Sequence, residues 1–194
     1  MDSTKDNNKK EINKNKKKRD NWVVTVIIIT FTIALVLGFS SEILSKKLSL
    51  FPALLILMAI IMIGIVFDVI GLSIATADAK IFHAMAAKKV KGAKQALKLL
   101  KNVEKFTNVC NDVVGDIAGI VSGATGGSIG VMILNMIKIE GVTLEVFFLS
   151  LVSALIAALT VGGKAFGKKI AINNANDIVF TVAKILHFFG FGKK

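Results

Sequence analysis

Carboxylate and amide side chains interrupt two long apolar stretches of this sequence. Asp68 lies inside LFPALLILMAIIMIGIVFDVIGLSIATA, and Asn111, Asp112 and Asp116 lie inside NVCNDVVGDIAGIVSG. A charged side chain at the centre of a bilayer costs roughly 2.5–3.5 kcal/mol, so three unpaired carboxylates would cost on the order of 8–10 kcal/mol. Membrane proteins keep such groups when they bind an ion, relay a proton or pair with a cation. We therefore expect a cation site between two helices.

The depth of these side chains predicts that they meet. Asp68 lies nine residues before the end of its apolar stretch, or roughly 14 Å at the rise of an α-helix. Asp116 lies ten residues into the next stretch, or roughly 15 Å. The two helices would be antiparallel, so both carboxylates would come close to the bilayer midplane, with Asp112 one turn shallower. Oxygen atoms from Ser73 and Asn111 would complete a shell of the kind that Mg²⁺ or Ca²⁺ prefers.

Three explanations of the acidic residues stay open. They bind a cation, they line a proton path, or they serve structural packing, either protonated by burial or paired with Lys164. Lys164 would act as a gate or counter-charge. No Cys/His cluster favours zinc or copper. We find no nucleophile–base pair, phosphate loop or metalloprotease motif, so we do not expect an enzyme.

The composition indicates one membrane domain. Of 194 residues, 54% are hydrophobic, against 45–50% in a usual soluble domain. The single cysteine excludes an internal disulfide framework. The net charge of +12 accompanies no nucleic-acid motif, so we expect no nucleic-acid partner.

Apolar runs and charge predict the organisation of the chain. Residues 1–20 are basic and polar, and we expect them to be disordered and cytoplasmic. Lysines and apolar residues alternate with helical spacing in the segment 79–102, which predicts an amphipathic helix or a short helical hairpin, broken near Gly92. A second amphipathic helix is expected at 170–190, with Ile178, Val182, Ile185 and Phe189 on one face.

Membrane spans are expected at about 22–38, 51–77, 106–137 and 143–163, the last ending at Gly162 and Gly163.

The positive-inside rule orients these spans. We expect the chain to lie in the plasma membrane. Four spans then place both termini and the 78–105 loop in the cytoplasm, which puts all but three of the 25 Lys and Arg residues inside. The basic segments would also attract anionic lipid headgroups. A cleaved signal peptide is the alternative for the first span.

A glycine ladder runs along the third predicted span. Gly115, Gly119, Gly123 and Gly127 follow one another every four residues and so share one helix face. Small residues at this spacing let another helix approach closely. We expect this face to pack tightly, and the protein to form a homodimer through it.

The order of these motifs resembles the transmembrane domain of the CNNM/CorC family of magnesium transport proteins. The likeness covers roughly residues 50–190 and rests on FDVIGLSIATAD, GAKQALKLLKN, CNDVVGD and GKAFGKKIAI. In that family a dimer binds Mg²⁺ near mid-membrane through Ser and Asn side chains, carbonyl groups and an acid. This sequence ends at Lys194 without the CBS domains that many members carry, so the resemblance implies no nucleotide regulation within it.

Position by position, the resemblance implies a rebuilt site. The family serine falls on Asp68, and the three asparagines of its motif fall on Asn111, Asp112 and Gly115, with Asp116 adjacent. The family glutamate falls on Lys164, its proline on Gly167, and its lysine is kept at Lys168. An acid thus replaces a serine and a lysine replaces an acid, which changes the charge of the site.

The sequence therefore predicts an all-α polytopic membrane protein with about four spans. Its expected function is a divalent-cation transporter or cation-binding membrane domain, with Mg²⁺ as the expected ion. The alternative is a non-transporting membrane scaffold or regulatory subunit that docks lipid or a protein partner.

Overall fold

The computed structural model describes residues 24–40, 43, 48–138 and 141–189. Every regular element within these residues is a helix, as the sequence predicts. Three of the helical runs are long and apolar enough to cross a membrane: α2 (Leu50–Thr76), the run Val103–Ile137 and α7 (Val142–Asn173). The predicted disordered segment 1–20 lies outside the described residues.

The first predicted span appears as a shorter apolar helix, Val24–Ser40. Residues 22 and 23 at its predicted start are not among those described. Val26 and Ala34 of this helix pack against the third helical run, with Ile60 of α2 beside them. The helix is therefore part of the bundle. The residues that it covers there are Val113, Ile117 and Val121.

The third helical run is divided into three parts. It begins as α5 (Val103–Asn108), widens into the π-helix η1 (Val109–Gly115) and continues as α6 (Asp116–Ile137). A π-helix has hydrogen bonds between residues five apart and is frequently found at functional sites. It changes the phase between the residues before and after it, so faces deduced from α-helical spacing do not continue through it. Apolar and polar spacing in the sequence predicts a plain α-helix here.

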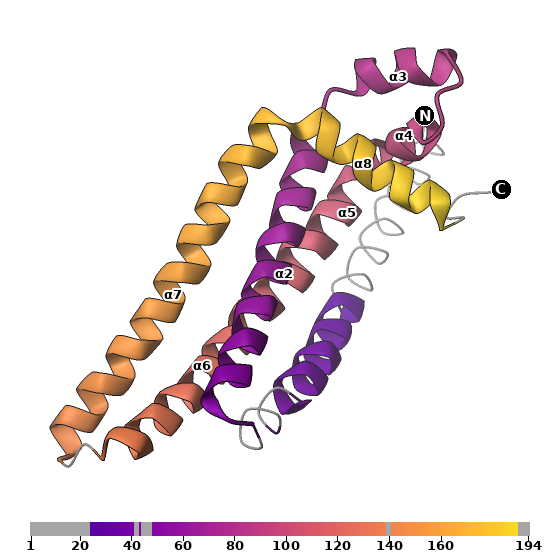
Figure 1. The fold of residues 1–194 in the computed structure, drawn as a ribbon. Helices are drawn as coiled ribbons and strands as arrows, with labels where there is room; N and C mark the ends of the chain where they lie inside the picture. The colour runs from indigo at the N-terminus through magenta and orange to yellow at the C-terminus, as the bar shows by residue number, and fades with distance from the viewer. Residues whose placement is uncertain (1–23, 41–42, 44–47, 139–140, 190–194) are drawn as a thin grey trace, which may run out of the picture.

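Helix α2 is central to the bundle. It packs against α5, η1, α6, α7 and α8 (Ala175–Phe188). In Figure 1 the long helices α2, α6 and α7 run side by side, and α8 crosses their upper end. Helix α2 carries apolar residues all around, which suits a helix surrounded by other helices and lipid. A core cluster of Ala53, Leu57, Ile61, Ile129 and Ile156 joins α2, α6 and α7.

Glycines set the close approach of these helices. A Cβ at Gly64 of α2 would stand 2.8 Å from the Ala118 Cβ of α6. A Cβ at Gly167 of α7 would stand 2.7 Å from Cγ2 of Val69, and Gly163 similarly faces Ile65.

The contacts of Gly163 and Gly167 correct the predicted end of the fourth span. Helix α7 does not end at Gly162 and Gly163 but continues to Asn173, because packing against α2 supports its glycine-containing turns.

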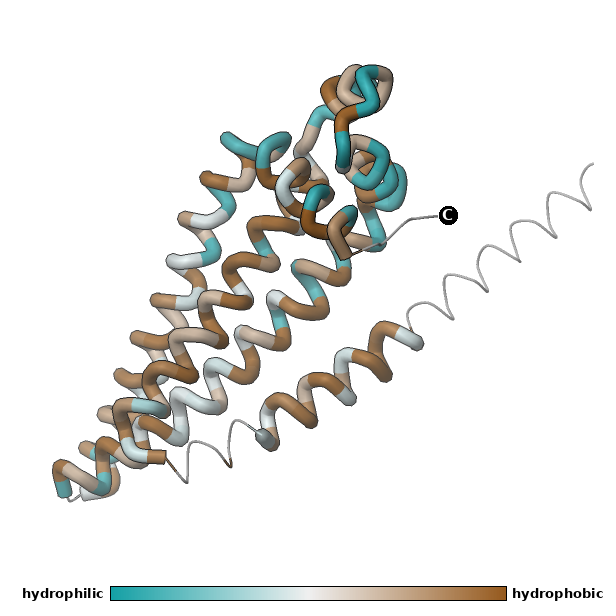
Figure 2. Tube along the Cα trace, turned by 45° about the vertical axis from the view of Figure 1, so that its right-hand side comes forward, coloured by the Kyte–Doolittle hydropathy of each residue, from teal (hydrophilic) through white to brown (hydrophobic). Residues whose placement is uncertain are grey.

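A helical cap closes one end of the bundle. It comprises α3 (Ala79–Ala87), α4 (Ala93–Lys101) and α8, and Figure 2 shows that it carries many of the hydrophilic residues. The turn between α3 and α4 contains Lys89 at φ 56° and Gly92 at φ 93°, a conformation that glycine adopts without a steric penalty. The segment 79–102 is thus a helical hairpin. Its core with α2 and α8 is formed by Ile74, Phe82, Ala96, Leu99, Val179 and Ala183.

Two long-range hydrogen bonds fasten this cap. The backbone N–H of Asp78 donates to Oδ1 of Asn176 at 2.9 Å, and Gln95 is hydrogen-bonded to His187 at 2.9 Å. Helix α8 packs only in part through its predicted face, in which Val182 contacts the core and Ile178 is half-buried. Its buried residues are Ala175, Val179 and Ala183, while Ile185 and Phe189 of the predicted face are exposed, because small residues let α8 lie close against α2 and α4.

Candidate functional site

Asp68 is a buried carboxylate in the middle of the bundle. It is 6% exposed, and its Oδ2 atom has no hydrogen-bond partner within the described part of the chain. It lies on α2 between the two core clusters that contain Ile61 and Ile74. A buried carboxylate oxygen without a partner is costly, and each such group calls for an explanation.

A second buried oxygen without a partner lies on the neighbouring helix. It is Oδ1 of Asn111, in the π-helix. Gly71 of α2 lies directly against this amide, and a Cβ there would stand 2.8 Å from the Asn111 Cγ. The absence of a side chain at Gly71 makes the space that the amide occupies. Asp68 and Gly71 are three residues apart and so lie on neighbouring turns of one face of α2.

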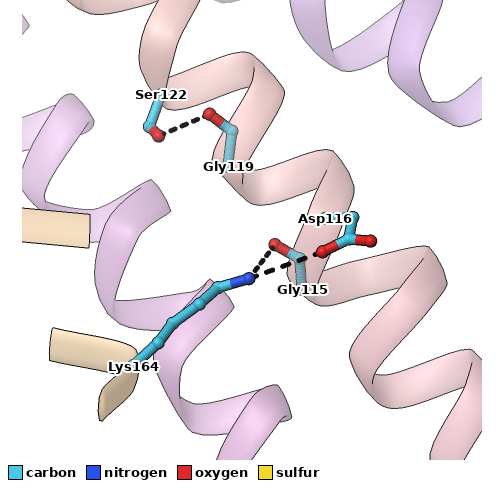
Figure 3. A network of polar contacts seen from close by, with 5 residues as sticks. All are labelled: Gly115, Asp116, Gly119, Ser122 and Lys164. Atoms are coloured by element: carbon cyan, nitrogen blue, oxygen red, sulfur yellow. Dashed lines mark hydrogen bonds and ion pairs between the residues drawn. The ribbon is translucent and has the colours of Figure 1, made fainter. Parts of the chain in front are cut away.

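Gly115 marks the point where three helices bring charges together. A Cβ at this position would lie 3.2 Å from Oδ1 of Asp68 and 3.6 Å from Nζ of Lys164. Lys164 extends from α7 and donates a hydrogen bond to the Gly115 carbonyl at 3.1 Å, as Figure 3 shows. Its Nζ also lies 3.6 Å from Oδ1 of Asp116. The side chains of Asp68 and Lys164 therefore border the same small space.

The other predicted ligands are either exposed or already hydrogen-bonded. Asp112 is exposed, and the Asp116 side chain is 67% exposed beyond its ion pair with Lys164. Ser73 is fully buried, but its hydroxyl donates to the carbonyl of Val69 at 2.7 Å and reaches that of Ala171 at 3.4 Å. Among the described residues no group of three or more His, Cys, Asp or Glu could hold a metal. Of the predicted ligands, only Asp68 and Asn111 thus present a buried oxygen without a described partner.

The glycine ladder divides into two parts. Gly115 touches the site, whereas Gly119, Gly123 and Gly127 have no described atom within 4 Å of a built Cβ. The close contacts between α6 and α7 come instead from Gly126, which faces Ile156, and from Gly130, which faces Leu149 and Val152. Within one chain, most of the ladder is therefore open. Its packing against a second copy stays a prediction.

A groove runs between α6 and α7 beside Lys164. It has a volume of about 260 Å³. Two of its hydroxyls donate to carbonyls of their own helices: Ser122 to Gly119 at 2.8 Å, drawn in Figure 3, and Thr160 to Ile156 at 2.8 Å. Their oxygen lone pairs can still accept hydrogen bonds. The groove is lined by Gly119, Ser122, Gly123, Ser153, Ile156, Ala157, Thr160, Val161 and Lys164.

Sequence reasoning found Asp68, Asn111 and Lys164 because polar residues stand out in apolar stretches. It missed Gly71, whose role depends on a contact with a distant helix. It also missed the π-helix, for which the only signal was the unusual run of polar residues and glycine around Asn111. Comparison with protein-family models, curated proteins and solved structures finds no match to this chain. The resemblance to the CNNM/CorC family therefore stays a prediction.

Proposed function

We propose that this chain is an integral membrane protein that binds and transports a divalent cation at a site between α2 and the π-helix. The observation that carries the proposal is the pair of buried oxygens, Oδ2 of Asp68 and Oδ1 of Asn111, that lack hydrogen-bond partners. Both are acceptors, and both are hard oxygen ligands. A single cation would compensate the two atoms together.

Two rival explanations account differently for these oxygens. Structural packing would be expected to supply each of them with a donor, since buried polar groups are generally hydrogen-bonded. A proton relay would protonate Asp68, which would then be a donor, and Oδ1 of Asn111 is a buried acceptor without a described partner. Cation binding instead makes the ion the partner of both oxygens.

Mg²⁺ is the first ion to test. Carboxylate, amide and carbonyl oxygens suit Mg²⁺ and Ca²⁺. Mg²⁺ usually keeps several of its waters and takes only one or two carboxylates from the protein. A site with one buried carboxylate and one amide fits this habit, and the sequence resemblance to magnesium transport proteins points the same way.

The proposed setting is the plasma membrane, with the helical cap and both termini on the cytoplasmic side and a homodimer formed through α6. The distribution of Lys and Arg supports this orientation. Anionic lipid headgroups are proposed to contact the basic cap.

One contact favours the alternative of a membrane scaffold. The ion pair between Lys164 and Asp116 balances one acid internally, as a purely structural pair would. In a scaffold Asp68 would also serve only helix packing, and the protein would be indifferent to ions.

Thermal unfolding of the purified full chain separates these functions. The protein is heated with and without millimolar Mg²⁺, Ca²⁺ or Co²⁺, alongside the variant Asp68→Asn and the control Asp177→Asn, which changes an exposed acid on α8. A ligand that binds only the folded state stabilises it by about 2.7 kcal/mol at a hundredfold excess over its Kd. An ion-specific stabilisation of wild type and Asp177→Asn, absent from Asp68→Asn, supports the proposal. An equal response of all three proteins places ion binding elsewhere.

A further inference from the structure

The ammonium group of Lys164 lies beside the proposed cation site and carries the same sign of charge as the cation. We propose that Lys164 is a tethered competitor of the ion, and that the ion binds as Lys164 withdraws into the groove between α6 and α7. This inference rests on the proposed function and adds to it the residue that sets affinity and release.

The contacts of Lys164 place it in competition with an ion. Its Nζ donates to the Gly115 carbonyl at 3.1 Å and lies 3.6 Å from Asp116. The space in front of Gly115 is bordered by this Nζ and by Oδ1 of Asp68. A cation bound to Asp68 would therefore lie close to the ammonium in a medium of low dielectric, where like charges repel strongly. The two cations cannot both bind favourably there.

Charge favours the exchange of lysine for ion. Asp68 and Asp116 carry two negative charges, and Lys164 in its present position compensates one of them. Withdrawal of the ammonium leaves two carboxylates near the site, which match the charge of one divalent ion. The lysine thus leaves the site with one uncompensated negative charge when no ion is bound, whereas an ion of charge +2 in its place compensates both, and an ion of charge +1 gains nothing over the lysine.

The groove provides a place for the withdrawn ammonium. Lys164 already lines it, together with the hydroxyl-bearing Ser122 and Thr160. These hydroxyl oxygens can accept hydrogen bonds from an ammonium, which has three donors on a flexible four-carbon stem. A lysine side chain can thus change position within the 260 Å³ of the groove without movement of the helices.

Removal of the ammonium tests the competition. The Mg²⁺ concentration that gives half-maximal stabilisation is measured for wild type, Lys164→Met and Lys164→Arg, with Lys168→Met as the control. Lys168 is exposed one turn further along α7. We expect Lys164→Met to bind Mg²⁺ about tenfold more tightly, a coupling of ordinary size between two sites. Lys164→Arg and Lys168→Met should bind like wild type or more weakly. The variant Lys164→Met/Asp116→Asn serves if Lys164→Met alone does not fold, because it also removes the charge of the acid that pairs with Lys164.

Filling the groove tests the withdrawal. Gly123 lines the groove and Gly127 does not, yet both have open space for a side chain. Gly123→Leu should weaken Mg²⁺ binding several-fold in wild type and leave it unchanged in Lys164→Met, while Gly127→Leu should have no effect in either background. Equal weakening by both leucines would contradict the role of the groove.

The outcomes distinguish this inference from the function on which it rests. If Mg²⁺ stabilises wild type but not Asp68→Asn, and Lys164→Met binds with unchanged affinity, the site stands and the competitor is overturned. If neither wild type nor Lys164→Met responds to any of the three ions, the proposed function itself fails. A response that appears only in Lys164→Met supports both.

Discussion

Gly71 of α2 lies directly against Asn111 of the π-helix, so that a Cβ at residue 71 would stand 2.8 Å from the amide carbon. Gly71 contributes no side chain here, so the Asn111 side chain fills the space between the two helices, and this contact places its oxygen in the interior of the bundle. The same approach brings the π-helix close to Asp68. Gly71 is therefore the packing residue on which the geometry of the proposed site depends most directly.

Gly71→Ala should disturb the site. The added methyl group has to displace Asn111, and overpacking of this kind typically destabilises by about 1–3 kcal/mol. We also expect the stabilisation by Mg²⁺ to be lost. The measurement is thermal unfolding with and without the ion. The matched control is Gly162→Ala on α7, where no described atom lies within 4 Å of the new Cβ. Normal ion response in Gly71→Ala would separate Asn111 from ion binding.

Ser73→Ala tests a ligand that the sequence analysis proposed. The Ser73 hydroxyl is committed to carbonyl groups of α2 and α7. We expect its loss to cost about 1 kcal/mol, the net value of one hydrogen bond. The ion-dependent stabilisation should persist. A variant that folds normally but no longer responds to Mg²⁺ would place Ser73 among the ligands after all.

Phe82 should be essential to the helical cap. It is fully buried among residues of α2, α4 and α8. Phe82→Ala is expected to destabilise the protein by about 3–5 kcal/mol, because it removes buried apolar surface and leaves a cavity. The readout is the unfolding temperature. Phe188→Ala provides the comparison, since Phe188 is 87% exposed, and a similar loss in both variants would argue against the packing described for the cap.

Two adjacent glycines of α6 should respond in opposite ways. Gly126 faces Ile156 closely, so Gly126→Ala should destabilise by about 1–3 kcal/mol through overpacking. Gly127 faces open space within the chain, and alanine favours a helix by up to about 1 kcal/mol over glycine. Gly127→Ala should therefore stabilise a single copy.

The oligomeric state of a bulkier variant at Gly127 tests the predicted homodimer. If two copies meet along the open part of the ladder, a bulkier residue at Gly127 separates them, and light scattering in detergent would report a smaller particle for Gly127→Leu than for wild type. An unchanged particle size would contradict a dimer through this face.

Features that show in the composition of a segment could be predicted from the sequence. Features that depend on contacts between distant helices could not. Long apolar runs identify three membrane-length helices, because insertion depends on composition more than on packing. Asp68 and Asn111 stand out for the same reason. The outward direction of Asp112 could not be deduced, because the π-helix changes the helical phase ahead of Asp116. Likewise, the ladder identifies a face of small residues, but Gly126 and Gly130 pack inside the chain instead, and only the position of α7 decides between them.

The unbroken course of α7 has a mechanical consequence. Its 32 residues span about 48 Å at the rise of an α-helix, well beyond the hydrocarbon core of roughly 30 Å. Val152 and Ile156 pack against α2 and α6, and Gly163 and Gly167 bear on α2 further along the helix. A stiff rod supported at two separate places resists tilting about either one. Helix α7 should therefore move together with α2, and carry any movement of the bundle to the end where it meets α8.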